Sequence, residues 1–69
     1  MNIKLPKHIV DELVNLTEHG MGYQNVRVIL QNGVKFDTQV LNSENLVIPN
    51  AALQFNVTID KIESIEYLN

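Results

Sequence analysis

The chain has 69 residues, 45% of them hydrophobic, and its eight acidic and five basic residues give a formal net charge of −3. This length fits a single domain over residues 1–69 with a thin core, and the hydrophobic content favours a folded chain over disorder. The absence of cysteine excludes disulfides and thiolate metal sites. No apolar run approaches the ~20 residues that span a bilayer, so we expect a cytoplasmic protein with no membrane partner.

Residues 6–19 are predicted to form an amphipathic helix. Apolar residues recur there at helical spacing, namely Ile9, Val10, Leu13, Val14 and Leu16. Pro6 suits the first helical position, and Gly20 stands where a left-handed residue would end the helix. A helix of this length is marginal alone. We therefore expect its apolar stripe to cover one mouth of a β-structure, with a partner-binding helix as the alternative.

The rest of the chain is predicted to form five short strands. Apolar and polar side chains alternate most clearly in residues 23–31, 34–42 and 52–58, and two further segments cover residues 46–48 and 62–68. For residues 52–58, a loop is the alternative to a full strand. A single helical turn is expected between the last two strands, near residues 58–61. One helix followed by five strands predicts a mainly β fold, a small and strongly bent antiparallel barrel.

The first two strands are joined by Asn32-Gly33, a strong hairpin signal. A two-residue turn would place apolar side chains of one strand opposite polar ones of the other. A three-residue loop, residues 31–33, pairs Val28 with Phe36 and brings the faces into agreement. We therefore predict this longer loop, with a positive φ at Gly33.

The last predicted strand indicates an association surface. Natural edge strands are guarded by lysine, proline or a bulge, but residues 64–68 contain Glu66 and neither Lys nor Pro. Ile29 and Leu41 also fall on the polar faces of their strands, which a strand bend, helix docking or a subunit interface would explain. We expect the edge to pair with another subunit, giving a dimer, or a ring if the contact is head to tail.

The stretch from Val26 to Phe36, two alternating segments around a glycine turn, resembles the opening of the first Sm motif. Asn42 and Asn45-Leu46 are similar to the end of that motif, where Sm-like proteins hold an RNA base. The resemblance implies a small barrel of the Sm-like or Src-homology type and an RNA-binding oligomer. However, residues 62–65 lack the Arg-Gly pair of the second motif, and the basic residues are scattered. RNA is therefore a disfavoured partner, and no DNA binding is expected.

A second resemblance extends along most of the chain. The Gly-Met-Gly-Tyr-Gln turn at Gly20–Gln24 and the Val-Leu-Asn-Ser-Glu segment at Val40–Glu44 are similar to segments of small uncharacterised bacterial proteins. This resemblance implies a bacterial source and no named activity.

Catalytic and metal-binding patterns are absent. His8 and Glu12 are one helical turn apart, but His19 is about two turns further along and rotated away, whereas zinc needs three or four convergent ligands. The carboxylates follow no motif that pairs them with Ser, Cys or His. We predict no metal site, no cofactor, no catalytic residue and no enzymatic activity.

Two segments form the candidate interaction surface: Met21, Tyr23 and Gln24 in the first, and Asn42, Glu44 and Asn45 in the second. The first precedes a strand rather than opening a helix, so it is not a phosphate loop. The plainer interpretation makes both segments turn formers. The predicted function is a non-enzymatic protein-interaction or self-assembling module, with a homo-oligomer or a protein as the partner. The alternative is an Sm-like RNA-binding oligomer, and an enzyme or small-ligand carrier ranks third.

Overall fold

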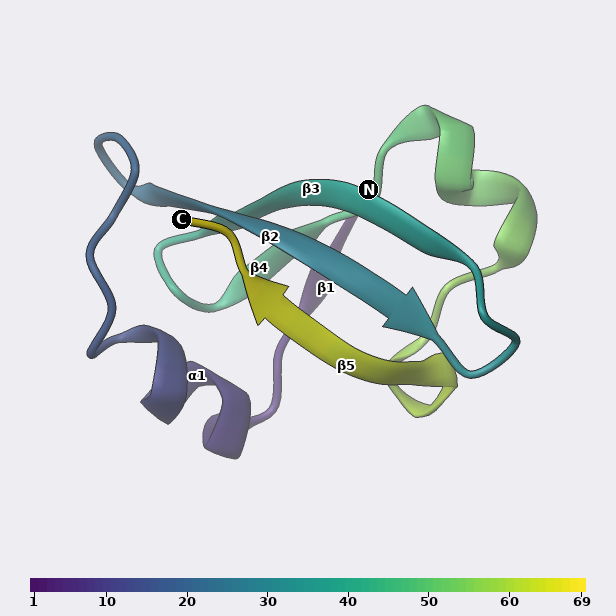
Figure 1. Cartoon of the computed structure of the whole chain (residues 1–69), viewed down its shortest axis with the longest axis horizontal. Coiled ribbons are helices and arrows are strands. Elements are labelled where there is room, and N and C mark those ends of the chain that lie inside the picture. The colour runs from purple at the N-terminus through teal and green to yellow at the C-terminus, as the bar shows by residue number, and fades with distance from the viewer.

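The computed structural model describes all 69 residues, which form a curled antiparallel half-barrel with one short helix (Figure 1). The elements in chain order are β1 (Asn2–Lys4), α1 (Lys7–Leu13), β2 (Tyr23–Leu30), β3 (Lys35–Leu41), β4 (Asn45–Val47), the 3-10 segments η1 (Asn50–Phe55) and η2 (Ile59–Lys61), and β5 (Ile62–Tyr67). The strand order is β1-β4-β3-β2-β5, and every neighbouring pair is antiparallel. The mainly β, five-stranded antiparallel prediction is confirmed, but β1 and β5 remain two open edges.

The hairpin of β2 and β3 forms the centre of the sheet, and its loop is the predicted one. Val28 lies opposite Phe36, and the N–H of Leu30 donates to the carbonyl of Val34 across 2.8 Å. Gly33 has a φ of +91°. Matching the two apolar faces therefore identified the correct register.

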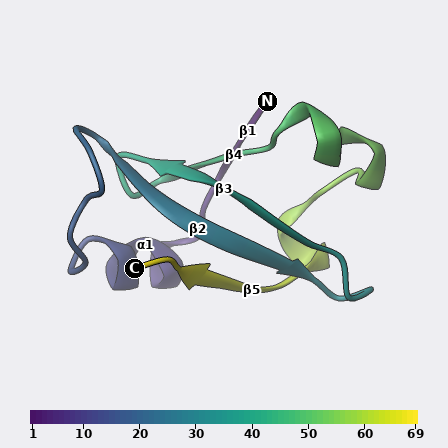
Figure 2. The ribbon, with the colours of Figure 1, turned by 45° about the horizontal axis from the view of Figure 1, so that its top comes forward.

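The interior of the half-barrel holds the core. Alternate residues of β2 are buried, and they pack with residues from the other elements in one cluster: Leu5, Leu13, Val26, Val28, Leu30, Val40, Leu46, Ile48, Ala52 and Val57. Figure 2 shows α1 at one end of the half-barrel and the two 3-10 segments at the other. Both ends of the core are therefore covered by irregular or helical chain rather than by strands.

The helix predicted over residues 6–19 is shorter than expected. It covers only Lys7–Leu13, with Pro6 as its N-cap. Leu13 is buried, and Ile9 and Val10 pack against the core from α1, so the helix does cover one end of the β-structure. Val14, predicted to lie in the same apolar stripe, is 59% exposed because the helix has ended there. Gly20 does not supply a left-handed cap.

The strand predicted over residues 52–58 is wrong. Residues 50–55 form η1, and Asn56 follows with a left-handed φ of 50°. The apparent alternation points Leu53 into solvent, where it is 43% exposed, while Ala52 is 2% exposed. The helical turn expected near residues 58–61 is present as η2.

The first strand, β1, was not predicted. It pairs with β4, placing Ile3 opposite the buried Leu46. Three residues with one apolar side chain between two polar ones are too short a pattern to identify a strand in sequence. This strand supplies the fifth member of the sheet in place of residues 52–58.

Candidate interaction site

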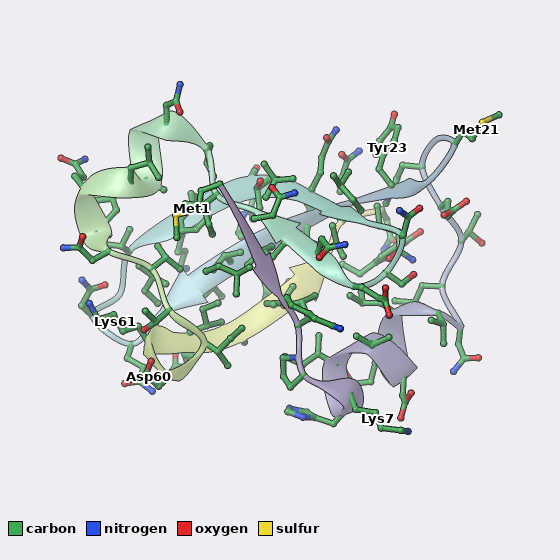
Figure 3. All side chains as sticks on the ribbon, turned by 180° about the vertical axis from the view of Figure 1, so that it is seen from behind. Met1, Lys7, Met21, Tyr23, Asp60 and Lys61 are labelled. Carbon is green, nitrogen blue, oxygen red and sulfur yellow. The ribbon has the colours of Figure 1, made fainter.

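Two turns meet at one end of the half-barrel, and they contain the residues that the sequence singled out. The N–H of Asn42, after β3, donates to the carbonyl of Gly22, before β2, across 2.8 Å. Tyr23 pairs with Leu41 at the adjoining strand ends. The two segments are therefore neighbours in space, and Figure 3 shows Met21 and Tyr23 together at this end.

The side chains of the first segment differ in exposure. Met21 is 100% exposed at the tip of the turn, beside Gly22 with its φ of +81°. Tyr23 is half-buried, and its ring lies over Gly20, where an added Cβ would come within 2.2 Å of the ring carbon Cε2. Gln24 is only 1% exposed, so its side chain belongs to the interior.

Gln24 ties the segment after α1 to the sheet. Its Nε2 donates to the carbonyls of Leu13 and Leu16, each across 2.9 Å. Its Oε1 is buried and accepts no hydrogen bond within the protein. Gln24 thus bonds to the last residue of α1 and to the turn after it, where the Leu13 carbonyl also accepts the N–H of Leu16 across 2.9 Å.

The second segment is a tight turn with two left-handed residues, Asn42 at φ 52° and Ser43 at φ 60°. Glu44 is exposed, and its carbonyl accepts the N–H of Leu5 across 2.7 Å. Asn45 begins β4, where it pairs with Lys4 of β1. The backbone of this turn therefore holds the end of β1 in place, and asparagine tolerates the left-handed conformation that the turn requires.

A side-chain cluster that the sequence did not indicate lies where the C-terminal end of β5 meets the segment after α1. The rings of His19 and Tyr67 lie 4.8 Å apart. The Tyr67 hydroxyl donates to the carbonyl of Thr17, and His19 Nδ1 accepts the N–H of Asn25 across 2.9 Å. These contacts fasten residues 17–19 to the sheet, beside a shallow hollow of about 520 Å³ in which Leu68 is the one hydrophobic lining residue.

A row of alternating charges crosses the outer face of the sheet. Arg27 in β2 lies between Asp37 in β3 and Glu66 in β5, and its Nε donates to Asp37 Oδ1 across 2.7 Å. The hydrogen bond and charge of Asp37, with a smaller contribution from Glu66, raise the pKa of Arg27. The same hydrogen bond lowers the pKa of Asp37. Glu66 ends the row at the open edge of the sheet.

The open edge of β5 presents unpaired backbone groups. The N–H of Leu68 donates to the carbonyl of Asn25, so in the antiparallel ladder with β2 that follows the bulge, Ser64, Glu66 and Leu68 bond to β2. Ile65 and Tyr67 therefore direct their N–H and C=O groups outward. A bulge at Glu63 interrupts the ladder with β2 at the start of the strand, and no lysine or proline follows it in β5.

A groove of about 230 Å³ lies between this strand and the start of α1. Its apolar lining comes from Ile9 in α1 and from Ile59, Ile62 and Ile65 in or just before β5. Pro6, His8, Glu63 and Ser64 complete the lining. A chain laid along β5 would find backbone partners on the edge and apolar contacts in the groove.

The remaining chemistry of the surface is sparse. No three side chains of the His, Asp or Glu type gather as metal ligands, and α1 is too short to cross a membrane. Besides the open strand edges and the isoleucine groove, the surface carries scattered charges and separate exposed apolar side chains such as Met21 and Val14. No family model, no curated protein and no solved structure matches this chain.

Proposed function

We propose that the protein is a small non-enzymatic module for protein association, which adds an extended chain to the free edge of β5. The observation that carries this proposal is the pair of outward-facing backbone units at Ile65 and Tyr67, beside the isoleucine-lined groove. Strand addition to an open edge takes its affinity from main-chain hydrogen bonds and its specificity from alternate side chains. The added chain belongs to a second copy or to another protein.

The small size of the core supports this proposal. Ten residues form the buried cluster, and domains of this length have little stability to spare. An added strand would cover the half-buried Ile62 and Ile65 and would form hydrogen bonds with the unpaired backbone groups of β5. Association would then stabilise the fold by mass action, because it removes apolar surface and backbone groups from water.

We also propose kinship with the small Sm-like and Src-homology barrels. The support is the resemblance at residues 26–36 together with the antiparallel succession β2, β3 and β4. RNA binding, which that resemblance implies, ranks second. Among the five basic residues, Lys7 and Arg27 already pair with carboxylates, and no observation on the surface favours a phosphate backbone.

Sedimentation equilibrium at tens of micromolar tests the proposal. We expect an average mass above the 7.8 kDa of one chain that rises with concentration. Ser64→Lys places a lysine on the edge strand and should weaken association, because the lysine must lose water when a strand is added. Gln31→Lys, with the same gain of charge in an exposed loop, should leave it unchanged. A clean monomer throughout the concentration range would refute self-association.

A further inference from the structure

The two open edges, β1 and β5, have complementary patterns of free backbone groups. On either side of β1, the N–H of Leu5 donates to the carbonyl of Glu44, and the carbonyl of Met1 accepts the N–H of Ile48. Ile3, between them, therefore also bonds to β4, and Asn2 and Lys4 direct their backbone groups outward. In β5 the outward residues are Ile65 and Tyr67. Each edge thus presents every second residue to a further strand.

Parallel pairing brings these patterns into one register. In a parallel ladder, a residue that faces its neighbour bonds to the two residues flanking the one opposite it. Ile65 would therefore bond to Asn2 and Lys4 and lie beside Ile3. Both isoleucines project from the core side of their own sheets, since Ile65 pairs with the buried Val28 and Ile3 with the buried Leu46. The inner and outer faces of the two sheets then continue into each other.

The side chains agree with this register. Glu66 would lie beside Lys4, both exposed on the outer face. The row of Asp37, Arg27 and Glu66 would then continue with a positive charge. Opposite charges on neighbouring strands stabilise a sheet, and like charges destabilise it. One apolar pair, one charge pair and one polar pair, Ser64 with Asn2, thus arise from a single alignment.

We infer that the partner of the β5 edge is β1 of a second copy, aligned in parallel with Ile65 beside Ile3 of that copy. This inference rests on the proposed function. It makes the contact head to tail, because each copy offers β5 at one edge and β1 at the other. Such contacts generate closed rings or open filaments rather than two-fold dimers. Pairing of β5 with β5 would offer no lysine to Glu66 and, when centred on that residue, would oppose two glutamates.

The competing arrangement pairs β5 with β1 of the same chain. The four neighbouring strand pairs between β1 and β5 are all antiparallel, so these two strands run in the same direction within one chain as well. In the structure they are separate edges, and the groove lies between the start of α1, just after β1, and β5. A test must therefore distinguish a contact between copies from closure of a single half-barrel.

Disulfide trapping makes this distinction, because the chain has no cysteine of its own. Lys4→Cys and Glu66→Cys are prepared as separate proteins, mixed and oxidised. Neighbouring strands lie about 4.8 Å apart, within the range that a disulfide spans. We expect a cross-linked dimer that contains one copy of each variant. Lys4→Cys mixed with Ser64→Cys, two residues out of register, should cross-link far less.

The outcomes separate the inference from the proposed function. If the wild type associates in sedimentation but the Lys4→Cys and Glu66→Cys mixture does not cross-link, or the shifted pair cross-links as well, this interface is wrong while the proposed function stands. If the Lys4→Cys, Glu66→Cys double variant cross-links only within single chains, the edges close internally and the inference is overturned. A wild type that stays monomeric overturns the inference together with self-association.

Charge exchange supplies an independent readout that needs no oxidation. Glu66→Lys and Lys4→Glu should each weaken self-association about tenfold, since each replaces attraction with repulsion. The double exchange should restore the association constant to within about threefold of the wild type. Glu18→Lys, the same charge change at an exposed residue between α1 and β2, should leave it unchanged. Failure of the double exchange to restore association, after both single variants have weakened it, would overturn the Lys4–Glu66 pairing.

Discussion

Gly33 illustrates how a single backbone conformation fixes the central hairpin. Its φ of +91° is open to glycine and costly for other residues, and no atom lies within 4 Å of the place where a Cβ would be added. Gly33→Ala should therefore lower the free energy of unfolding by about 1 kcal/mol through backbone strain alone. Urea denaturation measures this, with Gln31→Ala in the same exposed loop as a control. A change near zero for both variants would contradict the strain.

Asp37 gives stability a predictable dependence on pH. The hydrogen bond from Arg27 lowers the pKa of the folded carboxyl below its ordinary value of 3.8. The stabilisation is therefore complete above the unfolded pKa and is lost as the pH falls through the folded one. Asp37→Asn should flatten the acid side of the stability profile, measured as urea midpoints between about pH 2 and pH 6. The contact is exposed, so the difference should shrink in high salt, and identical profiles would contradict the coupling.

Gln24 shows why some local structure could not be predicted from sequence. The apolar spacing of residues 6–19 favours a helix, yet the helix ends at Leu13. The carbonyls of Leu13 and Leu16 accept hydrogen bonds from the Gln24 side chain, which comes from β2. Gln24 follows Leu13 by 11 positions and Leu16 by 8, so these bonds form only when β2 packs against the end of α1 and the turn after it. A local pattern carries no information about them.

At the scale of whole elements, the hairpin was predictable and the segment after Pro49 was not. Register in the hairpin follows from matching two long alternating faces. In residues 52–58 the same alternation arises by coincidence, and Pro49 instead starts a 3-10 turn in which its carbonyl accepts the N–H of Ala52. The residue that η1 buries is the small Ala52, while the larger Leu53 remains exposed. Hydrophobicity alone therefore favours Leu53 as a core residue over Ala52, although it is right for Val57.

Substitutions in η1 test directly whether Ala52 is the residue that this segment buries. Ala52→Val should lower stability by about 1–3 kcal/mol, because two further methyl groups must enter a filled core. Ala51→Val, at the exposed neighbouring position, should change it by less than about 0.5 kcal/mol. Thermal unfolding of the pair measures both. The reverse order, with Ala51→Val the more damaging, would favour the strand over the 3-10 segment.

At the scale of the whole molecule, one open edge of the half-barrel, β5, was predictable from the sequence, and the other, β1, was not. The lack of lysine and proline in β5 is visible in the amino-acid sequence, and this pattern alone indicates an association surface. The complementary edge could not be foreseen, because β1 is three residues long and sits before the helix. The two predicted surface turns do lie side by side. However, the Gln24 side chain and the backbones of Asn42 and Glu44 already form hydrogen bonds within the chain, so these groups have a structural role without a partner. The open edges therefore carry the more specific hypothesis.

The charge distribution of the whole molecule argues against nucleic-acid binding. The net charge is −3, and Lys61 donates to the carbonyl of Asn56 while Lys7 and Arg27 face Asp11 and Asp37. Phosphate binding takes most of its free energy from unpaired basic groups that release counterions. A labelled oligouridine should therefore show no saturation up to about 10 μM protein at ~0.15 M salt, measured by fluorescence anisotropy. A submicromolar dissociation constant that weakens as salt rises would contradict this prediction and favour the Sm-like alternative.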